Sequence, residues 1–238
     1  MKKEEKRVQT GIKGMDKLIE GGFEEHSINL IAGGSGSSKT IFSMQFLIDG
    51  LKNGKTCLYI TFEEKREEFF KNMLDFGWDL EKYEKEGKFI FLEYSPEKVS
   101  SMLDEGGGVI ESIVMKKKVE RLVLDSISSF ELLFEAELEK REKTLALFDL
   151  IRKWGCTSIL TLEEMPKEVE KGATKSIEFE ADSIILLHFI RAERSRKRFL
   201  EILKMRGTNH STEIYSFDIK KDGIALGKVA KDKDLKED

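Results

Sequence analysis

The sequence contains few cysteines and few prolines. Its 238 residues include two of each. Two cysteines cannot form a disulfide framework, and Cys57 and Cys156 lie within or directly before apolar runs. We therefore interpret both thiols as small core residues of a protein in a reducing compartment, and we expect the protein to be cytoplasmic.

The sequence also lacks a long apolar run and an excess of charge of one sign. No stretch reaches about 18 apolar residues, so we expect no membrane span and no membrane partner. The charged opening residues include no apolar segment, so we expect no signal peptide. The 41 Lys and Arg residues face 45 Asp and Glu residues, for a formal net charge of -4. This balance argues against a general polyanion binder.

No Pro-, Gly- or Ser-rich linker divides the chain, and its length fits one domain. We predict a single domain over residues 8–226 between charged termini, residues 1–7 and 228–238, which we expect to fray. Short apolar runs alternate with helical patterns, which predicts an α/β fold with a mostly parallel, twisted central sheet flanked by helices. Residues 198–225 are expected to add antiparallel β-hairpins at one edge. Strands are expected at 27–32, 56–62, 89–93, 121–125, 157–162 and 182–190, and helices at 40–53, 64–76, 109–118 and 138–154.

A glycine-rich loop follows the first strand and opens the first helix. Strand, loop, Lys-Thr pair and helix come in the order of a Walker A phosphate-binding loop. Loop N–H groups and the helix dipole would hold phosphate oxygens. Lys39 would reach the β- and γ-phosphates, and Thr40 would bind Mg²⁺. The residues expected to contact ATP here are Gly33, Gly34, Ser35, Gly36, Ser37, Ser38, Lys39, Thr40 and Ile41.

One position of this loop departs from the motif. Ser38 stands where the pattern has glycine. A Cβ there would crowd the β-phosphate or resist the backbone angles of the loop. The motif therefore predicts a phosphate site but leaves its affinity open.

Carboxylates follow two of the other predicted strands. Asp125 ends one strand and fits a Walker B acid, while Glu63 and Glu64 end another. If that second strand lies beside the loop strand, both glutamates face the γ-phosphate. Such residues could hold the metal and orient the attacking water. Thr161 and Glu163 close a further strand, where a role at the γ-phosphate and a plain loop role are both open.

Several stretches together resemble the KaiC-like branch of the RecA-type ATPases, over about residues 8–226. The most specific stretch is residues 200–210, near the end of the chain. The phosphate loop alone is compatible with several protein superfamilies, and this stretch distinguishes between them. The stretches that carry the resemblance are residues 10–16 (TGIKGMD), 21–23 (GGF), 60–64 (ITFEE), 76–80 (FGWDL) and 200–210 (LEILKMRGTNH).

This resemblance implies a RecA-like P-loop ATPase fold and a homo-oligomeric ring, a hexamer, with ATP and Mg²⁺ at each subunit boundary. It makes Glu63 the principal catalytic glutamate, Glu64 its partner near Mg²⁺, and Asp125 the Walker B acid. Together with Thr40, the last two would be the metal ligands.

The resemblance also implies residues that contact the nucleotide from other positions. Lys204 and Arg206 would reach the γ-phosphate of ATP on the adjacent subunit. Judged by its alternation alone, Lys204-Met205-Arg206 is a strand with a solvated basic face. The other implied ATP contacts are Met205, Thr208, Asn209 and His210 toward the neighbour's nucleotide, and Asp75, Phe76 and Lys221 near the base.

We expect a slow, regulatory or signalling ATPase that acts on an unknown protein partner. Two alternatives stay open. In a nucleic-acid-stimulated ATPase, the expected nucleic-acid loop would be residues 163–178, which are acidic on balance and lack an aromatic residue for base stacking. The basic run 191–198 is more typical of a solvated face or a subunit contact, so we expect no nucleic-acid partner. In a nucleotide-dependent scaffold, Ser38 would have weakened hydrolysis and left an interaction surface.

Overall fold

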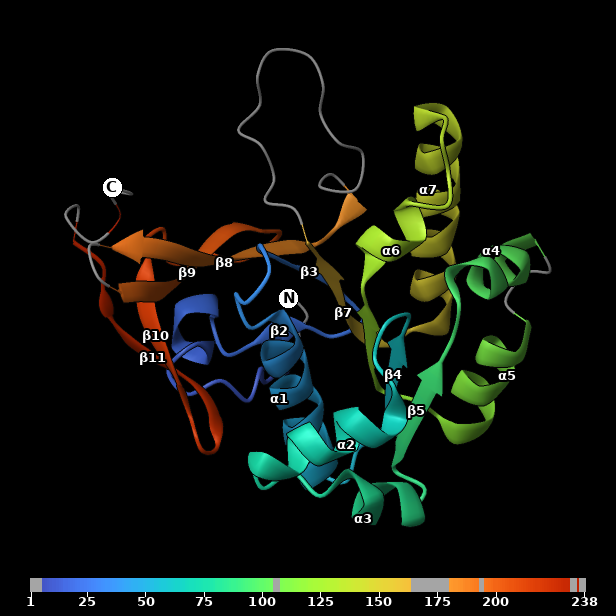
Figure 1. Ribbon diagram of the computed structural model, residues 1–238, viewed down its shortest axis with the longest axis horizontal. Coiled ribbons are helices and arrows are strands. Elements are labelled where there is room, and N and C mark those ends of the chain that lie inside the picture. Colours follow the sequence, from blue (N-terminus) through green and yellow to red (C-terminus); the bar gives the residue numbers. More distant parts are fainter. Residues whose placement is uncertain (1–5, 105–107, 164–179, 193–194, 232–234, 236–238) are drawn as a thin grey trace, which may run out of the picture.

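The computed structural model describes residues 6–104, 108–163, 180–192, 195–231 and 235 (Figure 1). The described part of the chain forms a nine-stranded sheet in the order β11-β10-β9-β8-β3-β7-β6-β4-β5, with a separate pair β1-β2. The strands are β1 (Arg7–Val8), β2 (Phe23–Glu24), β3 (Ile28–Ala32), β4 (Cys57–Thr61), β5 (Phe89–Glu93), β6 (Arg121–Asp125), β7 (Thr157–Leu162), β8 (Ser183–Ala192), β9 (Ser195–Met205), β10 (Tyr215–Lys220) and β11 (Gly223–Val229). The helices are η1 (Asp16–Ile19), α1 (Lys39–Lys52), α2 (Arg66–Asp75), α3 (Leu80–Lys85), α4 (Pro96–Asp104), α5 (Gly108–Lys117), α6 (Ile127–Glu131) and α7 (Glu137–Trp154).

The strands from β8 to β5 pair in parallel, and β9, β10 and β11 extend the sheet antiparallel at one edge. This confirms the predicted fold class. The parallel strands are apolar along their length because helices cover both of their faces. The antiparallel strands form consecutive hairpins, beginning with β8-β9.

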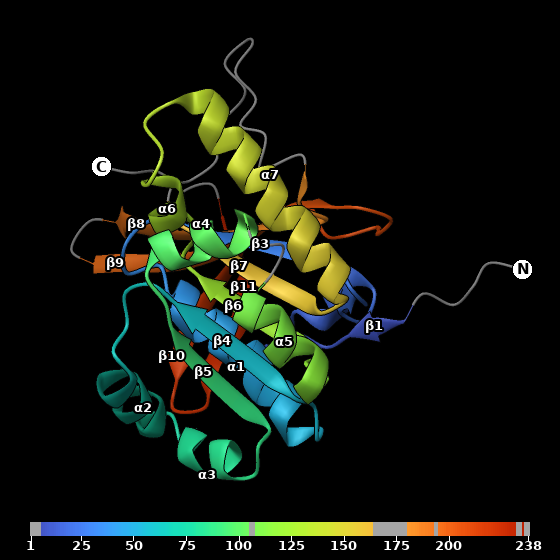
Figure 2. The same cartoon turned by 90° about the vertical axis from the view of Figure 1, so that its right-hand side faces the viewer.

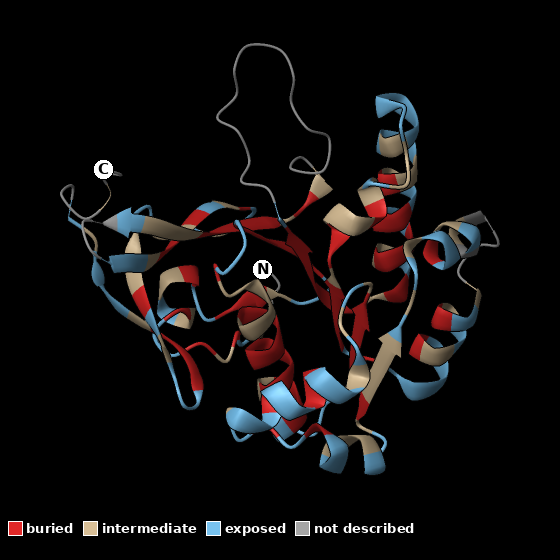
Figure 3. Cartoon of the chain, in the orientation of Figure 1, coloured by how far each residue is buried: buried red, intermediate tan, exposed pale blue. Residues whose placement is uncertain are grey.

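Alternate residues of each central strand enter two different cores. Tyr59 and Val123 pack with α1, α2 and α3 on one face, whereas Leu58 and Leu122 pack with α4, α5, α6 and α7 on the other. Figure 2 shows the second helix layer, with α5 and α7 in front of the sheet. In Figure 3 the central strands β3, β4, β6 and β7 are mostly buried, and the outer surfaces of the helices are exposed. This period of two fixes which side chains at the strand ends point toward α1.

Short elements are what the sequence patterns missed. The unpredicted helix α3 is capped by Asp79, whose carboxylate accepts a 3.0 Å hydrogen bond from the Lys82 N–H group. Helices α4 and α6 and the pair β1-β2 were also not predicted. These segments are too short to show a clear period, so capping and tertiary contacts decide their structure.

Both ends of the fold differ from the expected limits. Arg7, expected in a frayed terminus, pairs with Glu24 in the β1-β2 ladder. At the other end β11 continues to Val229, which pairs with Tyr215. Among the described residues, no helix combines the length and apolarity that crossing a bilayer requires.

Candidate nucleotide-binding site

The glycine-rich loop joins β3 to α1, as the sequence predicts. Gly33 packs so closely that a Cβ there would lie 2.4 Å from the Leu187 carbonyl oxygen, and Gly36 has a φ of 76°. The Lys39 ammonium donates to the carbonyl oxygens of Gly33 at 2.8 Å and Gly34 at 3.3 Å. The lysine is thereby held over the loop, where the first turn of α1 presents N–H groups without intrahelical acceptors.

Ser38 is the N-cap of α1 and adopts a left-handed conformation, with φ 82° and ψ 27°. Its side chain makes no capping hydrogen bond. The conformation is therefore the one expected for glycine, and serine adopts it at a cost in backbone strain. Beside it, the hydroxyl of Ser37 is buried and has no hydrogen-bond partner among the described residues.

Asp125 lies at the centre of a hydrogen-bond cluster at the carboxyl ends of the strands. Its Oδ2 accepts from the hydroxyls of Thr40 at 3.1 Å and Tyr59 at 2.5 Å. Its Oδ1 accepts from the Thr161 hydroxyl at 2.5 Å. The cluster links the first turn of α1 to strands β4, β6 and β7. The predicted Walker A and Walker B residues are thus in direct contact.

The paired glutamates lie near this cluster, although β4 is not the neighbour of the loop strand. Strands β7 and β6 separate β4 from β3, so the strand that ends at Glu63 and Glu64 is not the neighbour of the loop strand. The neighbour of β4 on that side is β6, and Thr61 at the end of β4 pairs in register with Asp125 at the end of β6. The glutamates therefore lie next to Asp125 rather than next to the loop strand.

The first two residues after β4 are oriented by local hydrogen bonds. The N–H groups of Glu63 and Glu64 donate to the Thr61 hydroxyl at 3.2 and 3.0 Å. The exposed Glu63 carboxylate also accepts a hydrogen bond from the hydroxyl of Ser129 in α6. Glu64 is half-buried, and its burial, followed by the charges of Asp125 and Glu63, raises the pKa of its carboxyl group.

The residues around this cluster suit a hydrated divalent cation. The Thr40 hydroxyl and the carboxylates of Glu64 and Asp125 provide only oxygen donors, the ligands that Mg²⁺ prefers. A cation there would favour the charged form of Glu64, which burial and the charges of Asp125 and Glu63 disfavour. The three predicted metal ligands therefore fit Mg²⁺ chemically.

Sequence reasoning missed three side chains that complete the cluster. Tyr59 is fully buried, and burial, together with Asp125, raises the pKa of its phenol well above its ordinary value. Ser129 contacts Glu63, and the Ser128 hydroxyl accepts from the Glu163 N–H group at 2.8 Å. Tyr59 precedes Thr61 by two residues, so the strand period was a signal that both share one face.

The predicted γ-phosphate fingers lie at the other end of the sheet. Lys204 pairs with Ile184, and the Arg206 N–H group donates to Asp182, whose own N–H group donates to Ile28 at the start of β3. The phosphate loop follows the far end of β3. Within one chain the structure therefore does not bring Lys204 or Arg206 to the phosphate loop.

Both cations are held by backbone or acidic groups in this position. The Lys204 ammonium donates to the Ala181 carbonyl oxygen at 2.7 Å, and its burial, with Arg206 nearby, lowers its pKa. The Arg206 guanidinium lies 3.4 Å from Asp182, which also pairs with Arg152 at 3.1 Å. Met205 is buried in the core, so its side chain is not exposed to a ligand.

The remaining predicted contacts fall into two groups. Thr208, Asn209 and His210 follow β9 in the same region as Arg206, and Asn209 is exposed. Phe76 follows α2 and stacks on Trp78, with ring centroids 5.0 Å apart. Asp75 is the last residue of α2, and Lys221 is exposed in the turn between β10 and β11. Phe76 packs against the same core as Ile41, on the α1 face.

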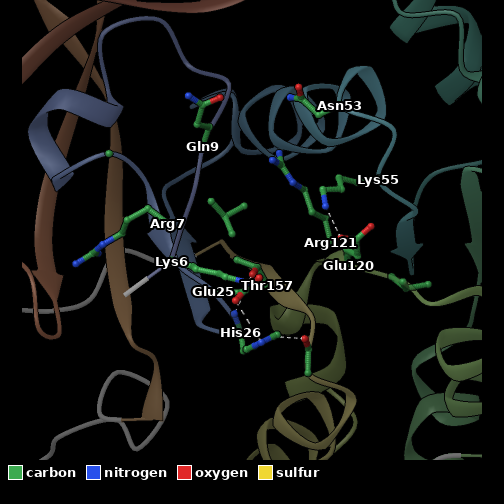
Figure 4. A pocket seen from close by; sticks show the side chains of 14 residues that line it. Lys6, Arg7, Gln9, Glu25, His26, Asn53, Lys55, Glu120, Arg121 and Thr157 are labelled. Carbon is green, nitrogen blue, oxygen red and sulfur yellow. Dashed lines mark hydrogen bonds and ion pairs between the residues drawn. The ribbon is translucent and has the colours of Figure 1, made fainter. Parts of the chain in front are cut away.

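A cavity of about 550 Å³ lies at the amino-terminal ends of β6 and β7 (Figure 4). Its lining includes Lys6, His26, Lys55 and Glu120. Lys55 and Glu120 form an ion pair at 2.7 Å. The cavity contains none of the predicted site residues. The loop expected for nucleic acid lies, except for Glu163, outside the described residues.

Comparisons with known proteins match nearly the whole chain to one family of ATPases. A family model described as "ATPase: KaiC" matches residues 8–231. The chain is 36% identical over 228 residues to the circadian clock protein KaiC3 of Synechocystis, covering 92% of this chain but 45% of that protein. It is 35% identical over 234 residues to a UPF0273 protein of Thermotoga maritima, covering 93% of this chain and 96% of that protein.

A solved structure agrees with these matches. The crystal structure of a KaiC-like protein from the hyperthermophilic archaeon Pyrococcus horikoshii superposes with a TM-score of 0.81 at 36% identity, covering 94% of this chain and 99% of that one. The resemblance seen in the residues is therefore confirmed over nearly the whole chain. With its phosphate loop in contact with Asp125 and its parallel sheet extended by antiparallel strands, the chain belongs to the KaiC ATPase family.

Proposed function

We propose that this protein binds ATP with Mg²⁺ between copies of itself in a ring, a hexamer, and hydrolyses it slowly as a regulatory ATPase. The contact of Thr40 with Asp125, beside Glu63 and Glu64, carries this proposal. It joins a phosphate-binding loop to the carboxylates that phosphoryl transfer needs.

Each group has a task in the proposed reaction. Lys39 and the N–H groups of the loop hold the β- and γ-phosphates, and the glycines admit the phosphates close to the backbone. Bound Mg²⁺ would neutralise charge on the phosphate oxygens. Thr40, Glu64 and Asp125 are the residues that would hold it. Glu63 accepts a proton from the attacking water as the bond between the γ-phosphorus and the ADP oxygen breaks.

The opposite position of Lys204 and Arg206 supports a site shared between copies. These cations stabilise charge at a γ-phosphate only if they reach one, and the sheet of their own chain separates them from their own loop. A ring in which each copy presents this end to the next copy's loop satisfies both requirements. Cations supplied in this way can raise the rate by about 10³-fold or more.

The test of the chemistry is substitution of Glu63. We expect Glu63→Gln to retain binding of ATPγS with Mg²⁺ by calorimetry and to lower the turnover of ATP by ~10²-fold or more, since the amide cannot accept the proton. Glu67→Gln, exposed in the first turn of α2, is the matched control and should leave turnover unchanged. Unchanged turnover in Glu63→Gln would reject Glu63 as the base.

Ser38, which stands where the motif has glycine, motivates a second candidate, a scaffold that binds nucleotide weakly and hydrolyses little. In that case, ATPγS with Mg²⁺ would fail to bind up to millimolar concentration. Binding at micromolar concentration or tighter would exclude this candidate and leave the ATPase.

A further inference from the structure

The amino-terminal strand reaches the loop that follows β9. Arg7 in β1 is 201 positions away from Thr208, yet its guanidinium donates a 2.8 Å hydrogen bond to the Thr208 hydroxyl. The Arg7 side chain is only 14% exposed. In Figure 4 it points away from Lys6, Glu25 and His26, which line the cavity on its other side. Arg7 lines the same cavity, but its guanidinium is directed to the loop.

The loop itself rests on the amino-terminal segment. A Cβ on Gly207, which has a φ of 64°, would lie 2.7 Å from a carboxylate oxygen of Glu24 in β2. Further along, the N–H group of Ser211 donates to the carbonyl oxygen of Leu18 at 2.9 Å. Residues 206–211 are thus positioned by β1, β2 and the helix η1 between them as well as by β9.

The bond from Arg7 also fixes the direction of the next bond. The Thr208 hydroxyl accepts from Arg7 and donates to the Arg206 carbonyl oxygen at 3.2 Å. The two bonds form a chain from Arg7 through Thr208 to the backbone of Arg206, and such chains strengthen one another. The orientation of Thr208 and the backbone at Arg206 therefore depend on Arg7.

The acceptor groups around Arg7 lie in several directions that a planar guanidinium can reach. Besides Thr208, the group donates to the Gly22 carbonyl oxygen at 3.4 Å and lies 3.7 Å from the carboxylates of Glu20 and Glu24. A planar fork of donors can serve these directions at once, whereas the single ammonium of lysine cannot. A change of Arg7 to Lys should therefore release the loop while retaining the charge.

We propose that Arg7 is a positioning residue of the nucleotide interface. It holds Thr208 and the loop 206–210 in the conformation that meets the nucleoside triphosphate bound by the neighbouring copy. This inference rests on the proposed site shared between copies. It adds the amino-terminal strand, which had been expected to fray, to the structures that determine nucleotide affinity.

The test uses mixed assemblies of two variants, co-expressed with different tags and purified through both. Lys39→Ala removes the phosphate-loop lysine but keeps the loop 206–210. This chain can therefore only provide the loop 206–210 to its neighbour, and we call it the donating chain. Arg206→Ala keeps the phosphate loop but loses one of the cations that would reach the neighbour's γ-phosphate. This chain can therefore only provide the phosphate loop, and we call it the accepting chain. If the site is shared, the mixture regains ATP turnover that neither variant has alone.

Arg7→Lys is then added to one chain at a time. In the donating chain we expect it to raise the KM for ATP of the mixture about tenfold, the loss of one charge-assisted hydrogen bond, with kcat within about twofold. Contacts to base and ribose hold the substrate and the transition state equally, so their loss appears in KM. In the accepting chain, the same substitution should leave both constants unchanged.

Two further variants complete the design. Thr208→Val in the donating chain should reproduce the effect of Arg7→Lys, and the double variant should add nothing to it. Lys6→Ala, next to Arg7 but facing the cavity, is the control and should change neither constant.

Three results would overturn the proposal, each in a different way. Equal effects from both chains would make Arg7 a general stabiliser of the fold. No effect from the donating chain would show that the loop is held without Arg7. A mixture that regains no turnover, although each variant folds as judged by thermal unfolding, would reject the shared site and with it the role of Arg7.

Discussion

At the scale of single residues, Ser38 carries a strain that glycine would relieve. Its φ of 82° lies in the left-handed region, where a Cβ is opposed by the backbone. The strain therefore belongs to the conformation of the loop itself. The sequence motif identified this position correctly, and the backbone angles show why the motif has glycine there.

We expect Ser38→Gly to raise the free energy of unfolding by about 1 kcal/mol, as measured by urea denaturation. The affinity for ATPγS should change less than about twofold, because serine already holds the conformation that the loop needs. Lys118→Gly is the matched control, since Lys118 also has a positive φ of 53° but follows α5. It should stabilise the fold similarly without touching the site. A tenfold gain in nucleotide affinity for Ser38→Gly would contradict this account and favour the weakened scaffold.

Glu64 provides a prediction of pH dependence. Burial and the charges of Asp125 and Glu63 raise its pKa above the ordinary 4.5. The folded state therefore binds a proton at Glu64 more tightly than the unfolded state does. This contribution to the free energy of unfolding is lost as the pH rises through the pKa of Glu64 in the folded state. At pH 7.5, without nucleotide or metal, Glu64→Gln should be more stable than the parent protein.

At pH 3 the two proteins should be equally stable, because Glu64 is then almost fully protonated in both the folded and the unfolded states. With ATP and Mg²⁺ the order should reverse, since only the carboxylate can hold the cation. Denaturant titrations at both pH values measure each difference. A variant that is less stable than the parent at pH 7.5 in the absence of ligand would show that the carboxylates do not repel one another.

At the scale of elements, the central strands and long helices were predictable because each shows a sustained pattern. The order of the strands was not predictable, since periodicity carries no information about which strands are neighbours. That is why the glutamates were expected beside the loop strand, whereas Asp125 on β6 stands between. The hydrogen bond of Tyr59 was missed for the same reason, and that of Ser129 was missed because α6 is too short to show a clear period.

Contacts between elements also include a buried amide that no motif indicates. Gln45 in α1 donates to the carbonyl oxygens of Gly11 at 2.9 Å and Ile224 at 3.0 Å. Its own oxygen accepts from the Ile224 N–H group at 2.6 Å. One side chain thus ties the helix of the phosphate loop to the opening turn and to β11.

Gln45→Leu should lower the free energy of unfolding by at least about 2 kcal/mol, because it leaves buried backbone groups without partners. Gln9→Leu, at an exposed position, should change stability by less than about 0.5 kcal/mol. Urea denaturation of both variants measures the difference. Equal stabilities would mean that the bonds of Gln45 contribute nothing net to the fold.

At the scale of the whole molecule, the two halves of the predicted site occupy opposite ends of one sheet. Thr40, Asp125 and Glu64 gather at the carboxyl ends of the strands, whereas Lys204 and Arg206 lie at the start of β3. The resemblance implies that a neighbouring copy supplies the second half, and within one chain Lys204 and Arg206 do not reach the phosphate loop. The ring is therefore the central claim of the proposed function.

The most direct test of that claim is complementation between two variants that are inactive alone. Mixed assemblies of Lys39→Ala and Arg206→Ala chains should hydrolyse ATP, because some boundaries combine an intact phosphate loop with an intact finger. About a quarter of the boundaries in a random equal mixture would be complete, which sets the expected scale of recovery. Mixed assemblies that form but remain as inactive as the separate variants would contradict a site shared between copies.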